Sequence, residues 1–90
     1  MVTGDIAVQT RRVLDNIGAL LTAGGLTYGD LVRTTVFLAE MNDFAAMNEA
    51  YRTYFTTPYP ARSTVQAARL PLDARIEIDA IAICEGSDGS

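Results

Sequence analysis

Three short runs of strand-forming residues share this chain with only two helical patterns. The strand runs cover residues 31–39, 62–69 and 75–83, and the helical patterns cover residues 5–24 and about 43–55. Because the order is helix, strand, helix, strand, strand, the first two strands should lie parallel and be joined by a right-handed crossover. Two helices can cover only one face of a sheet. The pattern therefore predicts an α+β domain in which both helices lie on one face of a mixed sheet.

Capping residues and prolines set the expected ends of the helices. Asp5 is suited to cap the start of the first helix, and Gly24 with Gly25 should end it. Asn42 or Asp43 should cap the second helix. That helix should reach about Phe55 before the prolines at 58 and 60 stop it.

Alternation along each strand predicts one apolar face and one mixed face. The apolar positions expected beneath the helices are Val32, Val36, Leu38, Val65, Ala67, Ile76, Ile78, Ala80 and Ala82. The mixed face carries Phe37, Ile81 and Ile83, which makes it too apolar to face water. We therefore expect this face to pack against other copies of the chain, in a homo-oligomer with polar sites at the subunit boundaries.

Composition excludes several classes of protein. The 90 residues allow one domain, expected over residues 1–85, with a flexible tail at 86–90. A net charge of −4 without a basic stripe disfavours nucleic acid as a partner, and no apolar run is long enough for a membrane span. The single cysteine, Cys84, cannot form an internal disulfide and fits a cytoplasmic location, where it should be inert packing. The absence of histidine argues against a zinc site.

Two lone charges on half-buried strands suggest a site for a small acid. Arg62 opens the second strand, and Glu77 lies inside the third. A guanidinium matches a carboxylate bidentately, whereas a carboxylate can hold or activate water. Structural alternatives remain open: Arg62 could pair at an interface, and Glu77 could pair with Arg33 or Arg75.

Residues of the second helix also have structural alternatives. Asn48 could merely cap a loop. The aromatic residues Tyr51, Tyr54 and Phe55 fit a core better than a ligand-stacking role.

The order and spacing of many short motifs over residues 4–83 resemble one protein family. The motifs are Gln9-Thr10, Val13-Leu14-Asp15-Asn16-Ile17, Ala23-Gly24-Gly25-Leu26, Thr34-Thr35-Val36-Phe37-Leu38, Met41-Asn42-Asp43-Phe44, Asn48, Tyr51, Tyr54-Phe55, Pro60-Ala61-Arg62-Ser63, Leu70-Pro71 and Ile76-Glu77-Ile78-Asp79-Ala80-Ile81-Ala82. The chain resembles the Rid family, also called YjgF-type, of small reactive-intermediate deaminases.

This resemblance implies a chorismate-mutase-like fold and a homotrimer whose sheets face inward, with active sites in the clefts between subunits. It implies a hydrolase similar to 2-iminobutanoate/2-iminopropanoate deaminases. Such an enzyme converts short-lived enamines and imines, such as 2-aminoacrylate, to keto acids and ammonia without a cofactor. By the same resemblance Arg62 clamps the substrate carboxylate and Glu77 positions the hydrolytic water. The backbone N–H of Thr64 and the side chain of Asn48 complete the substrate-binding set.

The chain departs from the family pattern at two places. Many relatives have cysteine where this chain has Thr64, and the chain starts just before the first family helix, at Met1. By resemblance, the N-terminal strands of the family are expected to be missing, which would leave residues 76–83 at a sheet edge.

The main functional alternative is a non-catalytic module that binds small carboxylates or a partner enzyme in the same clefts. A ribonuclease is disfavoured by the acidic charge and the lack of histidine, and a chorismate mutase by the absence of supporting motif spacing.

Overall fold

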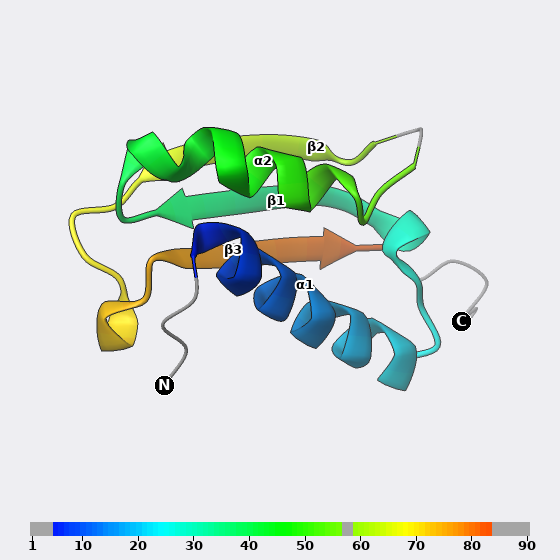
Figure 1. The fold of residues 1–90 in the computed structure, drawn as a ribbon. Coiled ribbons are helices and arrows are strands. Elements are labelled where there is room, and N and C mark those ends of the chain that lie inside the picture. The colour runs from blue at the N-terminus through cyan, green and yellow to red at the C-terminus, as the bar shows by residue number, and fades with distance from the viewer. Residues whose placement is uncertain (1–4, 57–58, 84–90) are drawn as a thin grey trace.

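Both helices cover the same face of a three-stranded sheet (Figure 1). The computed structural model describes residues 5–56 and 59–83. In chain order the elements are α1 (Ile6–Ala23), β1 (Leu31–Leu38), α2 (Phe44–Arg52), β2 (Ala61–Gln66) and β3 (Ile76–Ala82), with short 3₁₀ turns at Tyr28–Asp30, Met41–Asp43 and Pro71–Asp73. The strand order is β2-β1-β3, with β1 parallel to β2 and antiparallel to β3. The predicted α+β arrangement of two helices on one face of a mixed sheet is confirmed.

Helix α1 begins and ends where its capping residues indicate. The Asp5 carboxylate accepts a hydrogen bond from the Val8 N–H at 3.0 Å, which satisfies one of the helix's free N-terminal donors. Gly24 forms the C-cap, and Gly25 follows in the left-handed region, with φ of 76°, which glycine adopts without a steric penalty.

Helix α2 is shorter at its C-terminus than the sequence pattern predicts. It ends at Arg52, because the N–H of Tyr54 bonds to the carbonyl of Tyr51 in a tighter turn. Phe55 therefore lies beyond the helix, although its side chain is still buried. At the other end, the Asp43 carboxylate accepts a hydrogen bond from Arg75 at 2.9 Å instead of capping the helix.

The core lies between the helices and the covered face of the sheet. Its side chains come from α1, from α2 and Phe55 beyond it, and from strands β1 and β3. The most enclosed are Leu14, Val36, Leu38 and Met47. A hydrogen bond of 2.6 Å joins the hydroxyls of Thr34 and Tyr51 within this core, so neither buried hydroxyl is left without a partner.

The faces of the strands differ from the prediction at two places. A register shift between Leu31 and Arg33 leaves Val32 42% exposed, so the expectation that Val32 joins the core is wrong. In β2, Arg62 lies opposite the buried Thr34 in the strand register and therefore shares its face, whereas Val65 is 42% exposed. The polar side of this strand thus faces the helices. The prediction for β2 was reversed because it assumed that helices cover only apolar positions.

Two sequence expectations fall outside the described residues, namely those for Cys84 and for the tail at 86–90. Within the described ranges, no helix is both long and apolar enough to cross a membrane. The same ranges contain no group of three or more acidic, cysteine or histidine side chains that could hold a metal ion.

Candidate active site

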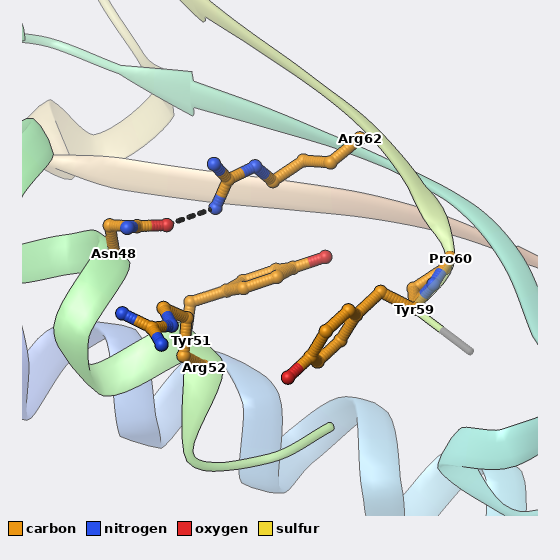
Figure 2. Close-up of a pocket in the computed structure, with 6 residues that line it drawn as sticks. All are labelled: Asn48, Tyr51, Arg52, Tyr59, Pro60 and Arg62. Carbon is orange, nitrogen blue, oxygen red and sulfur yellow. Dashed lines mark hydrogen bonds between the residues drawn. The ribbon is translucent and has the colours of Figure 1, made fainter. Parts of the chain in front are cut away.

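Arg62 projects from β2, which is an edge strand of the described sheet, toward helix α2 (Figure 2). Its Nη1 donates a hydrogen bond to Asn48 Oδ1 at 2.5 Å. The central guanidinium carbon lies 4.9 Å from the centroid of the Tyr51 ring and 5.5 Å from that of the Phe44 ring. Both distances allow a cation–π attraction.

Helical spacing explains why three different side chains of α2 reach one guanidinium. Phe44, Asn48 and Tyr51 follow one another at intervals of four and three residues, which places them on one face of the helix. The buried side chain of Met47 anchors the helix on the core, and the bond from Tyr51 to Thr34 fixes it to β1. The helix thus presents a rigid surface to Arg62.

A cavity of about 470 Å³ opens beside this guanidinium. Its lining combines the Arg62 and Asn48 side chains with an aromatic and apolar wall and a second cation; the lining residues are Asn48, Tyr51, Arg52, Tyr59, Pro60 and Arg62. Figure 2 shows Arg62 and Tyr59 approaching this space from the β2 side and Asn48 and Tyr51 from α2. A small organic acid would fit such a space, with its carboxylate at the guanidinium.

Arg62 forms no ion pair with any carboxylate in the part of the chain that the structure describes. Its one side-chain hydrogen bond there goes to a neutral amide, and two aromatic rings flank it. Because a guanidinium carries five N–H donors, most of its hydrogen-bonding capacity remains for an anion.

The backbone of β2 adds a donor next to Arg62. The N–H of Ala67 points toward β1, where it bonds to the Leu38 carbonyl at 2.9 Å. N–H groups alternate in direction along a strand, so the N–H of Thr64, three residues earlier, points away from β1 to the outer edge. The Thr64 hydroxyl is buried without a hydrogen-bond partner among the described residues.

Glu77 lies on the other face of the sheet. It pairs with Phe37 in the β1–β3 register, whereas Arg62 and Thr64 pair with the covered residues Thr34 and Val36. One chain therefore brings together Arg62, Asn48 and Thr64 but separates them from Glu77 by the sheet. The structural alternative in which Glu77 pairs with Arg75 is not observed, because Arg75 bonds to Asp43.

Sequence reasoning missed several residues around Arg62. The intervals between Phe44, Asn48 and Tyr51 could have revealed their common helix face. Arg52 lies four residues after Asn48, so the same spacing could also have placed Arg52 on this face. Tyr59 and Pro60 precede β2 in a segment without periodicity, which offers no comparable signal.

Comparison with known proteins identifies the family. The profile of the family described as "Endoribonuclease L-PSP" matches residues 1–84. The chain belongs to this family, which is the Rid or YjgF-type family. Of its members, the 2-iminobutanoate/2-iminopropanoate deaminase of Escherichia coli K12 is 51% identical over 85 residues, covering 91% of this chain and 66% of that protein.

Solved Rid structures share the fold described above. The crystal structure of the YjgF gene product of Escherichia coli is 50% identical with a TM-score of 0.87, covering 92% of this chain and 68% of that one. The structure of Escherichia coli TdcF with bound serine is 44% identical with a TM-score of 0.88, covering 93% and 68%. The chorismate-mutase-like fold expected from the resemblance is thus confirmed, and the present chain spans slightly less than two thirds of the length of the E. coli deaminase.

Proposed function

We propose that this protein hydrolyses reactive enamines and imines of small carboxylic acids, such as 2-aminoacrylate, to keto acids and ammonia. The observation that carries the proposal is the half-buried Arg62 guanidinium, which lines a cavity and has no ion pair among the described residues. Its support from comparison is the family membership and the deaminase activity in the name of a 51% identical relative. The serine bound to TdcF is itself a small molecule with a carboxylate.

In this proposal Arg62 binds the substrate carboxylate, and the outward N–H of Thr64 donates a further hydrogen bond to it. Together these two contacts orient the imine carbon in the cavity. Proper orientation can supply much of the rate enhancement for a substrate that already reacts with water.

Glu77 supplies the proton transfers. An enamine first becomes the imine when its terminal carbon takes up a proton and its nitrogen releases one. Glu77 then removes a proton from a water molecule as the water oxygen bonds to the imine carbon, and the C=N electron pair moves to nitrogen, which receives that proton from Glu77. The resulting carbinolamine loses ammonia as its hydroxyl becomes the keto oxygen. No step requires a cofactor.

Assembly would supply Glu77 from a neighbouring chain, because the sheet separates it from Arg62 within one chain. We propose a homotrimer in which the uncovered sheet faces, with Val65 at 42% and Ile81 at 57% exposure, pack inward. Burial of these side chains would stabilise the assembly. The lone cysteine is consistent with a cytoplasmic location for the enzyme.

The decisive experiment measures the consumption of 2-aminoacrylate generated in situ. The native protein should accelerate keto-acid formation, and Arg62→Ala should lose nearly all of that acceleration. Arg12→Ala, which removes an arginine from the exposed surface of α1, is the matched control and should retain it. Equal rates for the native protein and Arg62→Ala would reject the assignment. Binding of a keto acid without turnover would instead indicate a carboxylate-binding module.

A further inference from the structure

The Arg62–Asn48 contact joins a half-buried cation to an uncharged acceptor. Taking a guanidinium out of water is costly, and a carboxylate partner is the common compensation. Here the helix places an amide oxygen 2.5 Å from Nη1 at the position where a carboxylate of almost the same shape would fit. The described residues place no negative charge against Arg62 to reduce its positive potential.

The remaining contacts of the guanidinium are also uncharged. The Tyr51 ring lies beneath it at 4.9 Å, and the Phe44 ring flanks it at 5.5 Å. The Tyr51 ring is held in position, because its hydroxyl bonds to the buried Thr34 hydroxyl at 2.6 Å. Aromatic faces stabilise a cation without neutralising it, and they leave the edges of the guanidinium open for hydrogen bonds.

We propose that Phe44, Asn48 and Tyr51 form a neutral cradle that fixes the direction of Arg62 without neutralising its charge, so that the guanidinium can bind a substrate carboxylate. The inference rests on the proposed function and deepens it. Asn48 becomes a positioning residue that acts through Arg62, in place of the direct substrate contact that the family resemblance suggests. The neutrality of its side chain, and not only its shape, is then what substrate binding requires.

Asn48→Asp tests neutrality at nearly constant shape. The new carboxylate would form an ion pair with Arg62 and compete with the carboxylate of the substrate. We expect KM for the imine to rise by at least about tenfold, with kcat changed less than about threefold, because the lost interaction is one of ground-state binding. The midpoint of urea unfolding should not fall, since the cradle gains an ion pair.

Two further variants separate this role from others. Asn16→Asp makes the same chemical change on the exposed surface of α1 and should leave KM unchanged. Asn48→Ala removes the hydrogen bond but stays neutral, so it should raise KM less than Asn48→Asp does. If Asn48 instead contacted the substrate directly, Asn48→Ala should raise KM at least as much as Asn48→Asp does. Unchanged KM in Asn48→Asp would overturn the proposal.

Calorimetric binding of 2-oxobutanoate makes the inference independent of turnover. The native protein should bind this keto acid, and Asn48→Asp should bind it at least about tenfold more weakly. This result would support the cradle proposal even if no imine is hydrolysed. In that case only the proposed deaminase function fails. If the native protein does not bind 2-oxobutanoate at millimolar concentration, Arg62 is not a carboxylate receptor and the cradle proposal is wrong.

Discussion

At the scale of single residues, the surroundings of Tyr54 strongly raise the pKa of its hydroxyl. Its hydroxyl donates a hydrogen bond to Asp15 Oδ1 at 2.7 Å, which ties the segment after α2 to helix α1. Burial, together with the hydrogen bond and the charge of Asp15, raises the pKa of Tyr54 to about 12 from an ordinary value of 10.0. A phenolate at this position would lose its hydrogen bond and face the carboxylate directly.

The raised pKa predicts a loss of stability in alkali. Above pH 10 the unfolded chain releases the Tyr54 proton while the folded chain keeps it, so the free energy of unfolding should fall as the pH rises from about 10 to 12. Tyr54→Phe should show a shallower decline in urea-unfolding midpoints over the same range. Some slope should remain, because burial also raises the pKa of Tyr28. Identical slopes in the two proteins would contradict this account.

At the residue scale, the sequence singled out Arg62 and Asn48 as candidates but could not show how they meet. Arg62 stood out because a lone charge on a half-buried strand needs a partner. The sequence assigned Arg62 to the uncovered face, because alternation gives two faces without saying which one the helices cover. The neutral and aromatic groups of α2 make the covered face acceptable for a guanidinium.

At the scale of elements, a glycine marks the close approach of α1 to the turn that follows it. A Cβ at Gly18 would lie 2.2 Å from the Tyr28 hydroxyl oxygen. That hydroxyl donates to the Leu14 carbonyl at 2.7 Å, and the Tyr28 ring meets Tyr54 and Phe55 edge to face. The tyrosine therefore has little freedom to move aside.

Gly18→Ala should destabilise the fold, although replacing glycine by alanine in a helix interior normally stabilises the helix by about 1 kcal/mol. Overpacking against the held tyrosine should outweigh this gain and give a net loss of about 1–2 kcal/mol in urea unfolding. Gly24→Ala is the control, because a Cβ there would lie 3.6 Å from its nearest contact, the Leu21 carbonyl oxygen, and the change should alter stability by less than about 0.5 kcal/mol. Equal stability of Gly18→Ala and the native protein would show that Tyr28 can move.

The order and type of all five main elements could be predicted from the sequence, and so could the caps of α1. Asp5, Gly24 and Gly25 act within a few residues of themselves, so local sequence is sufficient. The exposure of Val32 could not be predicted, because the register shift that turns it outward depends on pairing with β3, about fifty residues later. The early end of α2 likewise comes from a turn that competes with the helix.

At the scale of the whole molecule, the uncovered sheet face predicts self-association. Val65→Lys places a charge on this face and should lower the mass measured by light scattering from that of a trimer toward that of a single chain. Val8→Lys is a closely matched control, because Val8 lies on α1 with 41% exposure against 42% for Val65. Loss of assembly in both variants, or in neither, would contradict an interface built on the sheet face.

The placement of Arg62 and Glu77 on opposite sides of one sheet makes the proposed chemistry a shared property of neighbouring chains. Arg62→Ala and Glu77→Gln should each be inactive alone. After the two are unfolded together and refolded as a mixture, roughly one quarter of the boundaries in a random cyclic trimer would carry both intact groups. Rescue to about that fraction of native turnover is therefore expected. A mixture as inactive as its components would mean that both groups must come from the same polypeptide.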